Sequence, residues 1–591
     1  MPNVATRSPL CRPLLVAVLL GMNAGLLAFN ALRCSPTLNE PWQLASGLRC
    51  WRTGRVETHL VNPPLVRCAA ALPVLALNAW QSDGLAWQHL QGQPGWVDGQ
   101  AKLTWEQWIT GMLPWARMPC VLFALAGALV SFWWAKELGG AWAGVVALAL
   151  WTLSPAILGH GALLTTDVPA ASFSLLAMWR CYGWLARPSW PSCLAGGGAL
   201  GVALLVKFTS LALVPCVLCL WIMSRRSCGA AAMPTARQPN THPSLGMLLV
   251  LLLVALLVVH AGYGFRRTGT ALGCLNLKSK TLTAPGAWLS AVPGRWLANI
   301  GRQIPVPLPA AFIEGIDEQL QDLERIQRTF LAGKWGTSGY WYYYLYALLV
   351  KAPLGHWCIF ALAVVASVLR GWRTLVVTDM AALLLPAGAV FLLVSGHTTW
   401  NEHTRYILPS GGFLFVAMAV ALARGRACNN WLGAATVAAL VLSGSSMLCH
   451  YPHMLGYFNE AAGGPARGYR HLRGSNTDWG QDFYLLKAWL QAHPEARPII
   501  LAARCGVPAE ALGIDYLPLT DPCSPALPAQ ESLRPGWYAV SVNAIDSPES
   551  TGHCWARMAP VARIGHTIWV FHVRAPRKEA ADRELLGSGA P

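Results

Sequence analysis

Ten long apolar stretches constrain the fold of this chain more than any other feature of its sequence. They lie at about 13–32, 112–134, 141–158, 168–185, 193–223, 245–262, 343–369, 379–396, 405–423 and 431–449. Each is long enough to cross, or nearly cross, about 30 Å of hydrocarbon as a helix. Charged residues make up only 12% of the 591-residue chain, whereas soluble domains contain about 25%. We therefore expect a mostly helical, polytopic membrane protein.

The run at 193–223 is ambiguous because Lys207 lies in its middle. It is either one crossing or two short, broken crossings that meet at Lys207. The second interpretation places Arg225 and Arg226 in the cytoplasm, as the positive-inside rule favours. About eleven crossings then result, with the N-terminus inside and the C-terminus outside. The first apolar run is longer than the core of a cleaved signal peptide, so we expect an uncleaved signal anchor.

Two domains are expected. Residues 1–449 form the transmembrane part, with outer loops at 33–111 and 263–342. Each loop contains a predicted surface helix, one at 65–80 and one within EGIDEQLQDLERIQRTF. Residues 450–591 form a small α/β domain on the outer face. Its predicted helix is DFYLLKAWLQAH, and its predicted strands lie in ARPIILAAR, GWYAVSVNA and TIWVFHV.

The formal net charge of +17 does not indicate a nucleic-acid partner. The basic residues are scattered through loops between apolar runs, where the positive-inside bias and attraction to anionic lipid headgroups explain them. No Cys/His cluster has the spacing of a zinc site, so we expect no metal and no cofactor. Of the 17 cysteines, Cys505, Cys523 and Cys554 lie in the polar C-terminal part, where two of them can pair if the domain is extracytoplasmic.

The expected topology places several polar residues at the outer face of the membrane. Charged groups at membrane edges are costly, so they count as candidates for function. They are Glu40 in the first outer loop, His160 and Asp167 in a short outer turn, Lys207 at the apex of the broken pair, and His403 and Arg405 at the outer end of a later span.

Carboxylates and cations at one membrane face suit a reaction with a phosphate leaving group. A carboxylate can take the proton of an attacking hydroxyl while arginine and lysine hold the departing phosphate. A sugar linked to a lipid phosphate fits this chemistry. Structural roles stay open: Glu40 as a helix cap or arginine partner, Asp167 as an N-cap, Arg405 as a snorkelling anchor, and the histidines as hydrogen-bonded interface residues.

Two stretches of the sequence are especially specific: the first loop, NEPWQLASGLRCWRTGRVETHLVNPPLVR, and the region around SNTDWGQD. Three weaker ones, HGALLTTDVPAASF, GVALLVKFTSLALVP and HTRYILPSGGFLFVA, lie between them in the chain. Together these five stretches resemble membrane glycosyltransferases of the GT-C superfamily, relatives of the protein O-mannosyltransferases and of the lipid A aminoarabinose transferase. The resemblance implies transfer of a sugar from a polyprenyl-phosphate-sugar to an acceptor on the outer face of the plasma membrane, with inversion at the anomeric carbon.

The family's first-loop motif is usually Asp-Glu, with the aspartate favoured as base, but this chain has Asn39-Glu40. Either Glu40 takes that role with help from Asp167, or the base lies elsewhere, or the activity is lost. By analogy, the residues facing the donor phosphate are Arg405, Lys207 and His403. The substrate region then contains Asn62, His160, Asn476, Asp478, Trp479 and Asp482.

Two other functions stay open. A transporter or flippase of lipid-linked sugars is expected to show repeated halves and ionisable residues near mid-membrane, and neither is evident. The second alternative is a non-catalytic protein with the same fold, and it stays open because Asn39 replaces the family aspartate. The sugar and the acceptor, whether protein, lipid or glycan, are not determined by the sequence.

Overall fold

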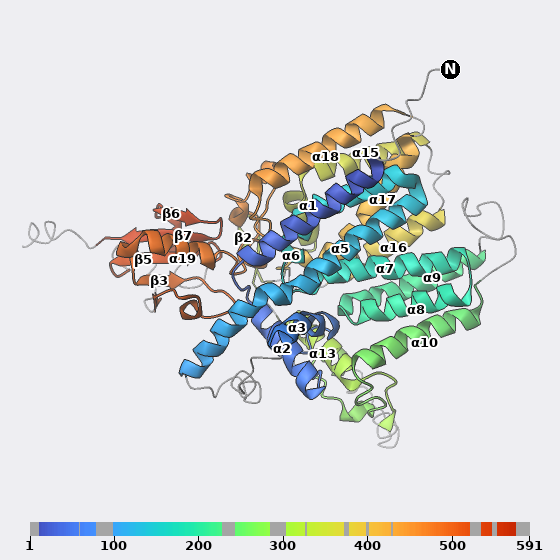
Figure 1. Cartoon of the computed structure of the whole chain (residues 1–591), viewed down its shortest axis with the longest axis horizontal. Coiled ribbons are helices and arrows are strands. Elements are labelled where there is room, and N and C mark those ends of the chain that lie inside the picture. Colours follow the sequence, from blue (N-terminus) through green and yellow to red (C-terminus); the bar gives the residue numbers. More distant parts are fainter. Residues whose placement is uncertain are drawn as a thin grey trace, which may run out of the picture.

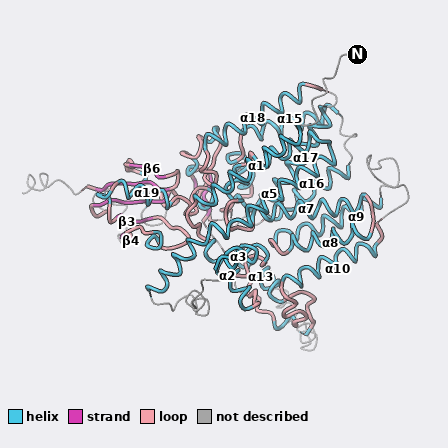
Figure 2. Tube along the Cα trace, in the orientation of Figure 1, coloured by secondary structure: helices cyan, strands magenta, loops and turns pink. Residues whose placement is uncertain are grey.

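The computed structural model describes residues 11–57, 59–78, 99–226, 243–283, 303–325, 328–337, 339–370, 377–396, 401–426, 429–519, 533–545 and 552–574. Cys523, one of the three cysteines considered for a disulfide, lies outside the described residues. A bundle of apolar helices forms the larger part of the molecule, and a small sheet lies at one end of it (Figures 1 and 2). The predicted mostly helical membrane fold with a small C-terminal α/β unit is confirmed.

The helices of the bundle lie at the predicted apolar runs. An apolar segment in a membrane forms a helix because a helix satisfies its own backbone hydrogen bonds. They are α1 (Cys11–Arg33), α5 (Gly99–Thr152), α7 (Asp167–Ala186), α8 (Trp190–Leu204), α9 (Leu213–Arg226), α10 (Leu245–Gly262), α14 (Tyr343–Lys351), α15 (Leu354–Arg370), α16 (Val377–Ser395), α17 (Leu408–Arg426) and α18 (Trp431–His450). Six helical segments of the described residues are long and apolar enough to cross a membrane, or seven if one bent pair counts as a span. The number of eleven crossings stays a prediction.

The long helix α5 doubles back on itself at Gly140. That residue has φ 82° and ψ 176°, a backbone conformation that favours glycine. The two halves pack tightly: a Cβ built on Gly144 would lie 2.9 Å from the Phe132 carbonyl oxygen, and one on Gly127 would lie 2.4 Å from the Trp151 ring. The chain therefore reverses between the predicted runs at 112–134 and 141–158.

The predicted interruption at Lys207 is confirmed. Helix α8 ends at Leu204, and a short 3-10 helix, η1 (Phe208–Ala212), leads into α9. Lys207 itself is extended, with φ −156° and ψ 139°. This break brings its ammonium group inside the protein instead of exposing it to lipid, which agrees with the high cost of a charge in hydrocarbon.

Shorter elements cover one end of the bundle. They are α2 (Glu40–Thr53), α3 (Leu65–Asn78), α6 (Pro155–Gly161), α13 (Ala310–Glu324), the antiparallel pair β1 (Thr329–Leu331) and β2 (Lys334–Gly336), and the 3-10 helices η5 (Thr404–Ile407) and η8 (Gly474–Asn476). Helices α3 and α13 are the two predicted surface helices, and both are found.

The C-terminal sheet has the strand order β4-β3-β5-β7-β6. Its elements are α19 (Phe483–Ala492), β3 (Ile499–Ala502), β4 (Tyr516–Pro518), β5 (Gly536–Ser541), α21 (Gly552–Ala556), β6 (Ala562–Ile564) and β7 (Ile568–Val573). Strand β3 is parallel to β4 and β5, while β7 is antiparallel to β5 and β6. The predicted helix and strands are present, and β4 and β6 are additional.

One apolar core joins this sheet to the outer helices. It includes Leu44 of α2, Val66 of α3, Leu113 of α5, Leu486 of α19 and Ile499 of β3, all at most 1% exposed. Burial of such side chains stabilises by about 1.5–3 kcal/mol each. The C-terminal sheet is therefore held against the end of the bundle.

Candidate functional site

A buried cluster of charged side chains lies where interrupted helices meet. Asp167 begins α7, Lys207 lies at the break between α8 and α9, and Arg405 lies in η5 ahead of α17. The Asp167 carboxylate lies between the two cations, 2.6 Å from Lys207 Nζ and 3.3 Å from Arg405 Nε. All three side chains are buried. The structure therefore brings together three of the predicted site residues.

These three residues carry two positive charges and one negative charge. The Arg405 guanidinium lies 4.1 Å from the centre of the Trp479 ring, and the Lys207 ammonium lies 4.5 Å from that of Tyr406. Aromatic faces attract cations and replace part of their lost hydration. Burial of a charge is nevertheless costly without a counter-charge. The cluster is thus suited to receive an anion.

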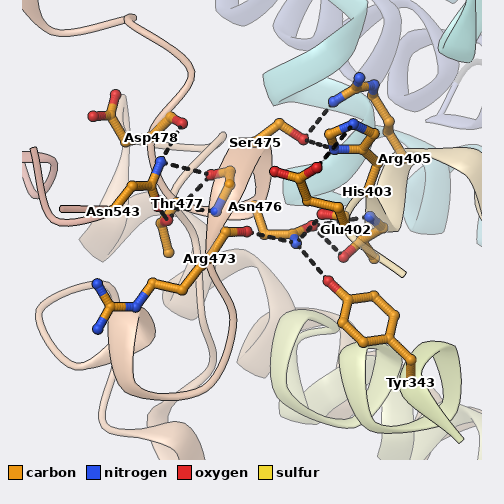
Figure 3. Close-up of polar contacts among 12 residues, drawn as sticks. Tyr343, Glu402, His403, Arg405, Arg473, Ser475, Asn476, Thr477, Asp478 and Asn543 are labelled. Atoms are coloured by element: carbon orange, nitrogen blue, oxygen red, sulfur yellow. Dashed lines mark hydrogen bonds and ion pairs between the residues drawn. The ribbon is translucent and has the colours of Figure 1, made fainter. Parts of the chain in front are cut away.

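Ser475 links Arg405 to His403 (Figure 3). Arg405 donates to Ser475 Oγ, and His403 Nδ1 lies 2.7 Å from the same oxygen. Burial, together with the charges of Arg405 and Lys207, holds the pKa of His403 well below its ordinary value. Burial also lowers the pKa of His160 to about 3. Both imidazoles are therefore neutral near pH 7 and serve as hydrogen-bonding groups, not as cations.

Residues 475–482, the SNTDWGQD stretch, connect η5 to the C-terminal sheet. Asn476 Oδ1 accepts from the backbone N–H of Thr404 at 2.9 Å, and Asn476 Nδ2 donates to the Tyr343 hydroxyl at 2.9 Å (Figure 3). At the other end, the Thr567 hydroxyl donates to Asp482 at 2.9 Å. Asn476 and Asp482 hold this connection, so they position the cluster from outside it.

Asp478 of the same stretch is buried against β5. It accepts hydrogen bonds from the Ser541 hydroxyl and from the Gly480 N–H, the latter at 2.9 Å. Burial outweighs these bonds and raises the pKa of Asp478 from 3.8 to about 6. The fold therefore favours the protonated carboxyl.

This pKa predicts that Asp478 stabilises the protein at low pH. Its contribution is complete below about pH 4, where the unfolded chain is also protonated, and is lost as pH rises through about 6. The loss amounts to about 3 kcal/mol for a shift of this size. We expect Asp478→Asn to remove this fall in stability, measured as thermal unfolding of purified protein between pH 4 and pH 7. The exposed Asp515→Asn serves as control, and identical pH profiles for wild type and Asp478→Asn would contradict the prediction.

Glu40, the expected base, lies in a buried ion pair between α2 and α5. Its carboxylate accepts two bonds from Arg117, at 2.7 and 2.6 Å, and two from the N–H groups of Thr37 and Leu164, at 2.9 and 2.8 Å. Burial alone would raise the pKa of Glu40, but Arg117 and these N–H groups lower it overall. A carboxylate so engaged is a poor proton acceptor. Because Leu164 immediately precedes the turn to Asp167, this geometry favours a positioning role for Glu40.

The Asn62-Pro63-Pro64 segment of the first outer loop also supports the cluster. Asn62 Oδ1 accepts from the Thr166 hydroxyl at 3.1 Å, next to Asp167. Arg67, which is buried, donates to the carbonyls of Asn62 and Val56 at 3.1 and 3.0 Å. Arg67 thus holds the loop. Asn39, at the position of the family aspartate, is exposed.

Sequence reasoning missed Arg117, Tyr406 and Ser475. Arg117 had a usable signal, because an arginine within the apolar run at 112–134 is costly unless it has a partner. Tyr406 and Ser475 lie in stretches that the sequence singled out, but only their contacts reveal their roles. Among the described residues, no group of three His, Cys, Asp or Glu side chains is arranged to hold a metal ion.

Residues 109–260 match the family model described as dolichyl-phosphate-mannose-protein mannosyltransferase. This segment contains Arg117, His160, Asp167 and Lys207. The match confirms the resemblance to GT-C membrane glycosyltransferases. The chain is thus related to glycosyltransferases at this general level. No curated protein sequence matches it.

Among solved structures, ArnT from Cupriavidus metallidurans bound to undecaprenyl phosphate is similar with a TM-score of 0.45 and 15% identity, over 96% of this chain and 99% of that one. The archaeal oligosaccharyltransferase AglB from Archaeoglobus fulgidus, in complex with an inhibitory peptide and a dolichol-phosphate, is similar with a TM-score of 0.44 and 12% identity. That similarity covers 74% of this chain and 56% of AglB.

Proposed function

We propose that this glycosyltransferase-related protein transfers a sugar from a polyprenyl-phosphate-linked donor to an acceptor on the extracytoplasmic membrane face, with inversion. The observation that carries the proposal is the buried Lys207–Asp167–Arg405 cluster, which has an excess positive charge and lies at the ends of apolar helices. A lipid phosphate supplies an anion at that depth, and its chain can remain in the bilayer. The family model names a lipid-phosphate-linked sugar as donor, which supports the same chemistry.

In this proposal Lys207 and Arg405 hold the donor phosphate. Arginine has five N–H donors and lysine three, so both keep donors for a phosphate while Asp167 holds them in place. As the bond from the anomeric carbon to the phosphate oxygen breaks, negative charge grows on the phosphate. Fixed cations in a buried site stabilise that charge more than water does. One displacement from the opposite side of the sugar inverts the anomeric carbon.

The other predicted residues receive supporting roles. Neutral His160 packs edge-on against Trp479, with ring centres 6.3 Å apart, beside Arg405. We propose that both border the donor headgroup and exclude water from it. His403 hydrogen-bonds through Ser475 to Arg405 and orients that guanidinium. Asn62, Asn476, Asp478 and Asp482 belong to the connections that hold the cluster together.

A disulfide supports the extracytoplasmic placement of the C-terminal sheet. Cys554 of α21 is disulfide-bonded. Disulfides persist in oxidising compartments and are rare in the cytoplasm. With the sheet outside, the cluster also faces outward, because residues 475–482 connect the two. The N-terminus is then cytoplasmic in the proposed topology.

The proposal is tested by product release. Purified protein in detergent is incubated with radiolabelled polyprenyl-phosphate sugars and a membrane extract as the source of acceptor, and release of free polyprenyl phosphate is followed, with heat-inactivated protein as control. We expect release from at least one donor and competitive inhibition by added polyprenyl phosphate. Binding of polyprenyl phosphate without release of sugar from any donor would instead favour a transport or non-catalytic role. Neither binding nor release by folded protein would overturn the proposal.

A further inference from the structure

A cavity of about 150 Å³ lies between the segments at Glu402, Gly474 and Asn543. At about 30 Å³ per water it has room for about five waters, which suits a single sugar-sized ring. Aromatic and polar groups mix in its wall, as in ligand sites generally. The wall is formed by Arg328, Phe330, Trp335, Tyr343, Asn401, Glu402, Arg473, Gly474 and Asn543.

Asn401, a residue of the cavity wall, has a hydrogen-bond acceptor that the described residues do not use. The side chain is 1% exposed, and its Nδ2 donates to the Tyr340 carbonyl at 2.6 Å, which sets the orientation of the amide. Its Oδ1 has no hydrogen-bond partner among the described residues. Buried polar atoms in proteins are nearly always paired. An unpaired acceptor in a cavity wall therefore points to a ligand that carries a donor such as a hydroxyl.

Glu402 places a carboxylate in the wall of the cavity. Its side chain is 39% exposed, in contrast to the buried Glu40 and Asp167. Gly474 lies against it: φ there is +64°, and an added Cβ would fall 2.4 Å from Glu402 Oε1. The glycine thus leaves the space that the carboxylate occupies.

Glu402 is also connected to the proposed phosphate site. Glu402 Oε2 lies 3.8 Å from His403 Nε2, and His403 Nδ1 lies 2.7 Å from Ser475 Oγ, to which Arg405 donates (Figure 3). A short path of side chains therefore leads from the cavity to the guanidinium. The partly exposed Glu402 carboxylate is thus linked to the cluster through His403 and Ser475.

We infer that Glu402 is the general base of this protein and that the cavity holds the hydroxyl-bearing ring of a glycan acceptor. The inference rests on the proposed function. The acceptor oxygen bonds to the anomeric carbon, the bond from that carbon to the phosphate oxygen breaks, and the hydroxyl proton passes to Glu402. Polyprenyl phosphate leaves as the anion held by Arg405 and Lys207. Asn401 Oδ1 accepts a second hydroxyl of the ring.

The acceptor, not the donor sugar, is assigned to the cavity because of the elements that form it. The donor arrives from the bilayer, next to α7, α8 and α17. The cavity is bordered mainly by the β1–β2 pair and by the segments at Glu402, Gly474 and Asn543, all outside the apolar helices. Of its lining residues, Tyr343 alone belongs to a bundle helix, at the first position of α14. An acceptor from the outer aqueous side meets these elements first.

The test compares Glu402→Gln with wild type and with Glu460→Gln, an exposed carboxylate on η6 (Glu460–Ala462). Turnover of a radiolabelled polyprenyl-phosphate sugar and binding of unlabelled polyprenyl phosphate are measured for each. We expect Glu402→Gln to lower kcat by about 10²–10⁴-fold, the usual contribution of a general base, with binding of polyprenyl phosphate changed less than twofold. Glu460→Gln should match wild type in both.

The outcomes of this test separate the role of Glu402 from the proposed transferase function. An active wild type with an equally active Glu402→Gln would overturn the role of Glu402 and leave the transferase function standing. A Glu402→Gln variant that loses binding of polyprenyl phosphate together with turnover would also overturn it, because a base for the acceptor does not hold the donor. An inactive, folded wild type would overturn the transferase function and the inference with it.

Discussion

Replacing Glu40 by glutamine is expected to lower the free energy of unfolding by about 3–5 kcal/mol, the usual cost of removing one partner of a buried ion pair. Arg117 would keep its bonds to the carbonyls of Ala31, Cys34 and Ser35, but its charge would be buried without a counter-ion. The loss is measured as a fall in unfolding temperature and in the yield of monodisperse protein.

This prediction separates a positioning role for Glu40 from proton abstraction. Glu57→Gln is the matched control, because Glu57 is an exposed carboxylate of the same outer loop, and such surface changes usually stay within about 0.5 kcal/mol. Any activity lost in Glu40→Gln should follow the fraction of folded protein. A Glu40→Gln variant with unchanged stability and no turnover would contradict us and return the base to the first loop.

Replacing Arg405 by lysine is expected to lower kcat/KM for the polyprenyl-phosphate sugar by about 10²–10³-fold, the range found when a fixed donor to a developing anion is removed. The planar guanidinium contacts Asp167, donates to Ser475 and stacks on Trp479 at once. A lysine ammonium is a point charge and cannot reproduce this combination. Both turnover and binding of polyprenyl phosphate should fall.

Arg426→Lys is the control for this variant. Arg426 is exposed at the far end of α17, the helix that begins directly after η5, so the same chemical change is made on the same helix away from the cluster. We expect its turnover to equal that of wild type. An Arg405→Lys variant with wild-type binding of polyprenyl phosphate would mean that the phosphate lies elsewhere.

Much of the helical architecture was predictable because it depends on local properties. A run of apolar residues forms a helix in a membrane whatever its neighbours are, so the helices of the bundle follow the predicted runs. Lys207 indicated the break between α8 and α9 for the same local reason. The reversal of α5 lay between two predicted runs, but the left-handed backbone of Gly140 that produces it is visible only in the structure.

The roles of the charged residues could not be predicted in the same way. The sequence singled out Glu40, Asp167, Lys207 and Arg405 because a charge near an apolar run is costly wherever it occurs. It could not tell which charges pair, since Glu40 meets an arginine 77 residues away and Asp167 meets a lysine 40 residues away. Nor could it tell that Glu402 lies beside Gly474 and Asn476, which follow it in the chain by more than 70 residues.

By itself, then, the sequence determined the kind of molecule: a bundle of apolar helices, broken at Lys207, with outer surface helices and a small C-terminal sheet. Only the tertiary structure decided which carboxylate is buried and which is partly exposed. Burial and a bidentate arginine occupy Glu40, two cations hold Asp167, and Glu402 faces a cavity. The reason is physical: proton affinity and access depend on the groups that surround a carboxylate in space, and those groups come from distant parts of the chain.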